Sequence, residues 1–160
     1  MHEYSWYFKM KTFKQYIIKE HKRLDHLNEK EQIERVRENG IDILDISNPS
    51  EKVQLVAVTV NPWIIQHIDN PPEEVQKAAV QTLGIVINYL KNTSNEVQKL
   101  AIQQTTNSIK HINNLSKEVQ EWFIKLKPDN ILEIPRDKLD PELAEKYKYL
   151  LSMSKAGIFK

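Results

Sequence analysis

The polar side chains that could bind or react recur along this 160-residue chain at intervals of 22 residues. One column of the repeat is polar or aromatic in all five copies and holds Asp45, His67, Tyr89, His111 and Glu133. Imidazole and carboxylate groups are metal ligands, and exposed aromatic side chains anchor contacts between proteins. This column is therefore the leading candidate for a binding surface.

His67 and His111 are too far apart to share a metal ion. They lie two repeat units apart, which is roughly 20 Å if stacked helices pack about 10 Å apart, whereas a metal–ligand bond is about 2 Å long. We therefore expect no metal, and we interpret the column as a continuous exposed strip that contacts a partner. The alternative is an ordinary solvated surface, because helical surfaces carry polar residues without any function.

A second column is glutamine in all five copies: Gln32, Gln54, Gln76, Gln98 and Gln120. It lies four residues before an all-aliphatic column, so the amides share a side of the helix with the core. A partly buried amide must be hydrogen-bonded. Two interpretations follow: a structural ladder in which each glutamine bonds the backbone of an adjacent turn, or a polar strip that binds a ligand.

Motifs for catalysis or cofactor binding are missing from the sequence. It has no cysteine, which removes disulfides, thiolate nucleophiles and the usual zinc sites, and its three glycines form no phosphate-binding loop. Neither His-Glu-x-x-His nor Gly-x-Ser-x-Gly occurs. We therefore expect a protein that is not an enzyme and has no cofactor. The lack of cysteine fits the cytoplasm, and no apolar run approaches the roughly 20 residues of a membrane span.

The repeat that positions these columns runs without gaps through five units. They span residues 26–47, 48–69, 70–91, 92–113 and 114–135. Three further columns are aliphatic in every unit, which marks them as core positions. These columns are Val36, Val58, Val80, Ile102 and Ile124; Ile43, Ile65, Ile87, Ile109 and Ile131; and Ile46, Ile68, Leu90, Ile112 and Ile134.

Each unit is predicted to form two short helices. The column between them holds Gly40, Pro62, Gly84, Thr106 and Pro128, four of which break or end helices. At the other junction, Asn48 and Asn70 are the predicted N-caps, and the prolines that follow them take the first helical position. We expect a first helix of about ten residues and a second of about one and a half turns with 3₁₀ character.

Helices this short bury their apolar sides only by stacking on neighbours. The sequence therefore predicts an all-α solenoid of five two-helix repeats, residues 26–135, inside a single domain that covers 1–160. The end units need caps. Residues 1–25 supply a lead and an amphipathic helix, and residues 136–160 supply a C-terminal helix that we expect to pack on Trp122 and Phe123.

Charge is unevenly divided along the chain. Residues 1–25 hold six basic side chains against three acidic ones, whereas residues 26–135 hold eleven against fifteen. The predicted N-terminal helix, residues 11–24, places basic side chains beside aromatic ones, which is typical of surfaces that bind single-stranded nucleic acid. A solvated helix face is the alternative. The basic residues concerned are Lys11, Lys14, Lys22 and Arg23.

Trp63 sits directly after the predicted turn at Pro62. In this position the indole is either part of the core or an exposed side chain that anchors an interface. Trp63 therefore joins the strip as a candidate partner-binding residue.

The unit from Asn48 to Val58 reads Asn-Pro-Ser-Glu-Lys-Val-Gln-Leu-Val-Ala-Val. It resembles the short helical repeats of uncharacterised bacterial and phage proteins, which are similar to HEAT and armadillo solenoids. The resemblance implies an α-solenoid and no reaction. The composition, rich in lysine, asparagine and isoleucine, also resembles that of phage proteins, which suggests inhibition of a host protein. We therefore expect a non-enzymatic protein–protein interaction scaffold, with nucleic-acid binding through the N-terminal helix as the alternative.

Overall fold

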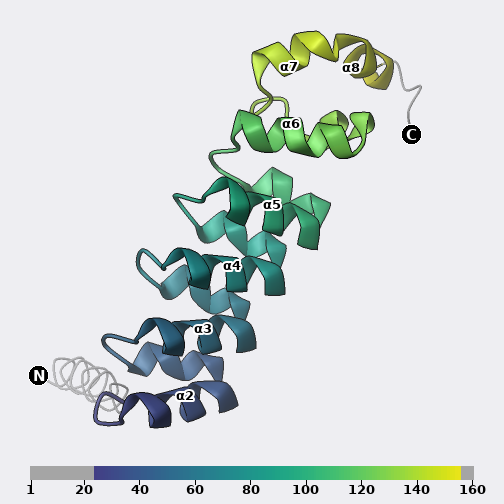
Figure 1. The fold of residues 1–160 in the computed structure, drawn as a ribbon. Coiled ribbons are helices and arrows are strands. Elements are labelled where there is room, and N and C mark those ends of the chain that lie inside the picture. The colour runs from purple at the N-terminus through teal and green to yellow at the C-terminus, as the bar shows by residue number, and fades with distance from the viewer. Residues whose placement is uncertain (1–23, 156–160) are drawn as a thin grey trace, which may run out of the picture.

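The computed structural model describes residues 24–155, and within them the predicted all-α solenoid is confirmed (Figure 1). Five ten-residue α-helices stack as successive rungs: α2 (Glu29–Glu38), α3 (Glu51–Val60), α4 (Glu73–Thr82), α5 (Asn95–Gln104) and α6 (Lys117–Leu126). Each is followed by a six-residue 3₁₀ helix: η1 (Gly40–Asp45), η2 (Pro62–His67), η3 (Gly84–Tyr89), η4 (Thr106–His111) and η5 (Pro128–Glu133). The chain then continues into α7 (Pro141–Lys146) and α8 (Lys148–Lys155).

The three aliphatic columns form the core between the rungs. Fourteen of their fifteen members are buried, and Ile68 is the partly buried exception. The buried side chains form two clusters that meet within α3: Ala57 belongs to the N-terminal cluster and Val58 to the C-terminal one. From α3 to α5, each helix thus packs against the units before and after it, as the short length of the helices requires.

The predicted N-caps were wrong by two residues. The α-helices α3, α5 and α6 are capped by Ser50, Ser94 and Ser116, whose hydroxyl groups each accept the backbone N–H three residues later. Asn48 lies outside α3, and Asn70 has a left-handed backbone with φ of 48°, which asparagine tolerates better than most residues. The prolines after these asparagines therefore lie in the loops and do not begin the helices.

The two ends differ in how far the structure describes them. Leu24 is buried in the N-terminal cluster, and the rest of the predicted helix 11–24 lies outside the described residues. At the other end, Asp140 caps α7, and Phe123 and Leu143 belong to one buried cluster. Trp122 is partly buried and packs against the same cluster, and Lys99 Nζ of α5 lies 6.0 Å from its ring centroid.

The junction between the second and third units lacks polar links that other junctions have. The cap of α6, Ser116, donates its hydroxyl to the preceding unit's Asn95 at 2.7 Å, and its backbone N–H to the preceding unit's Gln98 Oε1 at 3.3 Å. The cap of α4 is Pro72, which has neither group. The equivalent acceptor, Gln54 Oε1, is buried without a hydrogen-bond partner among the described residues.

We expect the substitution Pro72→Ser to stabilise the protein by about 0.5 kcal/mol. A serine would cap α4, as Ser50, Ser94 and Ser116 cap other helices of the stack, and this gain of about 1 kcal/mol outweighs about 0.5 kcal/mol lost to the freer unfolded chain. The φ of −53° at Pro72 is close to the −61° of Ser50, so the backbone need not move. Urea denaturation measures the change. Pro71→Ser is the control, since it loses the same rigidity without gaining a cap.

Candidate functional site

The structure places the five residues of the predicted strip at equivalent positions. Each is the last residue of a 3₁₀ helix, so one lies on every unit along one edge of the solenoid: Asp45, His67, Tyr89, His111 and Glu133. The side chains of His67, Tyr89 and Glu133 are exposed, and those of Asp45 and His111 are partly buried. The strip therefore has one residue at the same position of every unit, but the charge and exposure of these residues vary from unit to unit.

Trp63 and Tyr89 form an exposed aromatic pair that joins η2 to η3. Their ring centroids are 6.0 Å apart with an interplanar angle of 73°, which is the edge-to-face arrangement that aromatic rings prefer. Trp63 is 42% exposed and Tyr89 is 41% exposed. Both residues therefore offer large rigid surfaces to solvent, although each has one ring neighbour.

Two aliphatic side chains on η1 extend this exposed surface. Ile41 and Leu44 are 52% and 49% exposed. They are three residues apart, so they share one face of a 3₁₀ helix, whereas Ile43 lies on another face and is buried. The sequence analysis missed them, although the eclipsed i, i+3 spacing of a 3₁₀ helix could have indicated their common face. We call Ile41, Leu44, Trp63 and Tyr89 the apolar patch.

The apolar patch borders two equivalent grooves between successive loops. The first has a volume of about 350 Å³, and its walls include Leu44, His67 and Asp69. The second has a volume of about 390 Å³, and its walls include Asp69, Gln76 and Tyr89. Asp69 therefore stands on the wall that the two grooves share.

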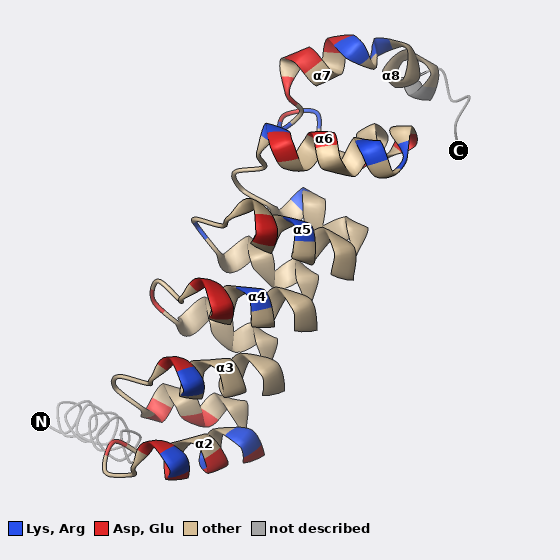
Figure 2. Cartoon of the chain, in the orientation of Figure 1, with Lys and Arg blue, Asp and Glu red and all other residues tan. Residues whose placement is uncertain are grey.

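This part of the edge is acidic. Residues 39–50 and 61–72 contain three aspartates and no lysine or arginine, and the red segments of η1 are visible in Figure 2. Asp42 is paired with Arg35 at 3.1 Å. Asp45, which is partly buried, and Asp69, which is exposed, form no ion pair with any residue in the range 24–155, so neither charge has a fixed counterion there.

In the fourth and fifth units, the strip residues His111 and Glu133 make contacts within the chain. Lys110 pairs with Glu133 at 3.5 Å, and Asn107 lies within hydrogen-bonding distance of the His111 ring at 3.4 Å. In the column that holds Trp63, these units have Asn107 and Asp129. The apolar and acidic character of the edge is thus confined to its N-terminal part.

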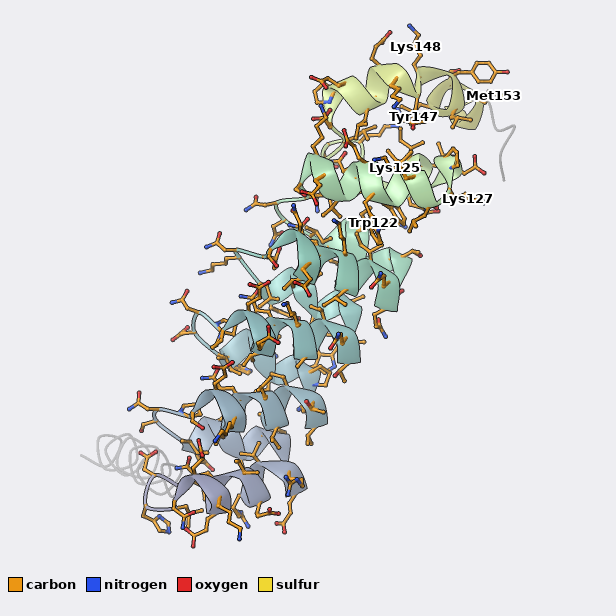
Figure 3. All side chains as sticks on the ribbon, in the orientation of Figure 1. Trp122, Lys125, Lys127, Tyr147, Lys148 and Met153 are labelled. Atoms are coloured by element: carbon orange, nitrogen blue, oxygen red, sulfur yellow. The ribbon has the colours of Figure 1, made fainter. Side chains whose placement is uncertain are left out.

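Lysines gather at the C-terminal end of the solenoid, as Figure 3 shows for Lys125, Lys127 and Lys148. Lys127 pairs with Asp129 at 3.5 Å, and Lys148 pairs with Glu145 at 2.5 Å. The predicted nucleic-acid-binding residues are a different set and lie outside the described residues: Lys11, Lys14, Lys22 and Arg23. Nucleic-acid binding through them stays a prediction.

The glutamine column is hydrogen-bonded to backbone in every unit. Each side-chain nitrogen donates to the carbonyl oxygen five residues earlier, at 2.9–3.3 Å, in Gln32, Gln54, Gln76, Gln98 and Gln120. Gln98 also bridges to the next loop, where its nitrogen donates to Asn114 O at 3.0 Å and its oxygen accepts Ser116 N–H at 3.3 Å. The amides of the second and third units make no such bridge, and their oxygens have no partner among the described residues.

Charged residues lie on the α-helices (Figure 2), and several of them link neighbouring units. The Ser94 hydroxyl donates to Glu73 at 2.7 Å and holds the pKa of that carboxyl below its usual value. A hydrogen bond from Lys99 at 2.8 Å lowers the pKa of Glu118. Hydrogen bonds to Glu96 and Glu74 raise the pKa of Lys77. These pKa shifts come from contacts that hold the stack together, away from the apolar patch.

We expect Gln98→Leu to destabilise the protein by about 2 kcal/mol, because it leaves the loop groups that Gln98 bridges, among them Asn114 O, unpaired. Gln54→Leu is the matched comparison and should cost less, since Gln54 makes one backbone bond and its oxygen has no partner to lose. Urea denaturation of both variants checks the order. Equal losses would contradict the bridging role.

We expect the protein to lose stability as the pH falls below about 4.5, the ordinary pKa of a glutamate. Because the folded pKa values of Glu29, Glu73 and Glu118 are lowered, their contributions are present above the unfolded pKa and are lost as the pH falls through the folded ones. Urea midpoints at neutral and acidic pH measure this loss. Glu73→Gln should show a smaller difference between the two midpoints, and an unchanged difference would contradict the assignment.

From residue 24 to residue 155, no three side chains of histidine, aspartate or glutamate lie close enough to hold a metal ion. The same stretch contains no helix with the length and hydropathy needed to span a bilayer.

The comparisons with known proteins add no relative. No protein-family model, curated protein or solved structure matches the chain. The resemblance to phage and bacterial helical repeats therefore stays a prediction, and the function must be argued from the surface of the molecule.

Proposed function

We propose that the chain is a non-enzymatic protein-binding scaffold whose contact surface is the apolar patch. The observation that carries this proposal is the exposed Trp63–Tyr89 pair, of which Tyr89 lines one of the two grooves. Tryptophan and tyrosine dominate the binding energy of protein interfaces, because they bury a large area at a small cost in side-chain entropy.

The solenoid presents this surface on a rigid support. Trp63 and Tyr89 lie on 3₁₀ helices whose isoleucines are buried, so the ring positions follow from the core packing. A surface that is already ordered loses little conformational entropy on binding, which favours affinity. Ile41 and Leu44 contribute apolar area next to the aromatic pair.

The distribution of the shifted pKa values supports a non-enzymatic role. Catalytic sites gather titratable groups with shifted pKa values in a cleft. Here the shifted groups are on the helix starts and pair with the neighbouring unit, as Glu73 does with Ser94 and Glu118 with Lys99. The two grooves beside the apolar patch are lined by none of them.

The test is a comparison of three proteins in affinity capture and cross-linking. The wild type, the double variant Trp63→Ala/Tyr89→Ala, and the control Leu126→Ala are each used to capture proteins from the cells in which the chain occurs. Leu126 is 62% exposed and lies on α6, so its loss removes a comparable exposed apolar side chain elsewhere. Calorimetry of the purified pair then gives each dissociation constant.

We expect one protein to bind the wild type and Leu126→Ala equally, and to bind the double variant at least about 30-fold more weakly, as for a pair of interface anchors. Circular dichroism and urea midpoints confirm that all three proteins are folded. A partner that binds all three with the same affinity would refute the proposed surface.

A further inference from the structure

We propose that the partner of this surface is an extended, basic protein segment whose apolar side chains are three residues apart. The inference rests on the proposed function and identifies the kind of partner. Three features of the edge support it. They are the spacing of the grooves, the acidic residues beside them, and the confinement of both to the first three units.

The spacing of the two grooves selects an extended chain. They are equivalent places on successive units, so they are about 10 Å apart if the helices stack at the usual distance. An extended chain of the polyproline II type advances about 9 Å in three residues and returns to the same face. Apolar side chains three residues apart therefore match successive grooves.

The charges beside the grooves select a basic chain. Asp69 stands on the wall between the grooves, where a side chain of the ligand located between two apolar anchors would pass. Neither Asp69 nor Asp45 has an ion-pair partner within residues 24–155, and the two loops around them carry no lysine or arginine. A lysine or arginine of the partner would supply the missing counterion.

The edge changes after the second groove. Lys91 lines the far end of that groove and is the first basic residue of this edge. One unit further on, Gln98 ties the flanking loops together through Asn114 O and Ser116 N–H. Beyond it, Glu133 is neutralised by Lys110. The features that fit a basic extended ligand are thus confined to the first three units.

The probe is a short synthetic peptide of lysines with leucine at every third position. Three matched peptides accompany it: the same residues with the leucines adjacent to one another, glutamate in place of every lysine, and leucines at the spacing of a helix face. Binding to the full chain is measured by fluorescence anisotropy and repeated in high salt. The variants are Asp45→Asn/Asp69→Asn and, as a control with two acids removed elsewhere, Glu51→Gln/Asp137→Asn.

We expect the first peptide to bind most tightly, and its affinity to fall about fivefold in Asp45→Asn/Asp69→Asn and at least about tenfold in Trp63→Ala/Tyr89→Ala. The control should bind as the wild type does. Salt should weaken binding, because it screens exposed charges. Equal binding of all four peptides, a preference for the helical spacing, or an unchanged affinity in the aspartate variant would each overturn the inference.

A photoreactive side chain at position 66, which lines the second groove and leaves Trp63 and Tyr89 intact, identifies the occupant of the surface in the full chain. Cross-links to the added peptide support the inference. Cross-links to residues 1–23 of the same chain, or to a second copy, that the peptide cannot displace would overturn it and assign that occupant instead. If no peptide binds while capture of a protein still depends on Trp63 and Tyr89, the inference fails and the proposed function stands. If capture is also independent of these residues, both fail.

Discussion

Each pair of short helices in this chain can bury its apolar side only against another pair. A ten-residue helix followed by a six-residue one is too short to be stable in isolation, so the free energy of folding comes from the interfaces between units. This constraint explains why the core residues recur in columns, and why almost every column member is buried. It also explains why the two sides of each unit can differ: packing restrains the residues between rungs and leaves the outer edges free to vary.

The polar links follow the same division. On the α-helical side, serine caps, glutamates and lysines bridge successive rungs, and the glutamine column binds the loop backbone. These contacts satisfy groups that stacking would otherwise bury without partners, which would cost free energy. On the 3₁₀ side, the outward positions make few such bridges in the first three units. Side chains as different as Leu44, His67 and Tyr89 therefore occupy this edge without disturbing the stack.

The repeat made the fold predictable from the sequence, because an aliphatic residue that returns at every twenty-second position indicates a buried position in every unit. The N-caps were misplaced because Asn-Pro is a strong start signal, and it drew attention away from Ser50, two residues later. Ile41 and Leu44 were missed because isoleucine and leucine usually indicate core; only the eclipsed geometry of a 3₁₀ helix turns both outward. The grooves lie beside the second and third units, whose glutamines do not bridge to the next loop, and the identical residues in that column do not reveal this difference.

The division of the core into two clusters has a thermodynamic consequence. The two clusters meet within α3, and the junction at Pro72, which lacks the polar links of other junctions, also lies between Leu44 on the first unit and Tyr89 on the third. Repeat proteins fray from their ends, so the first units open before the middle of the stack does. A protein that binds both side chains at once would hold the first and third units together. The first two units could then open only when that protein dissociates, so the chain would resist proteolysis most when the protein is bound.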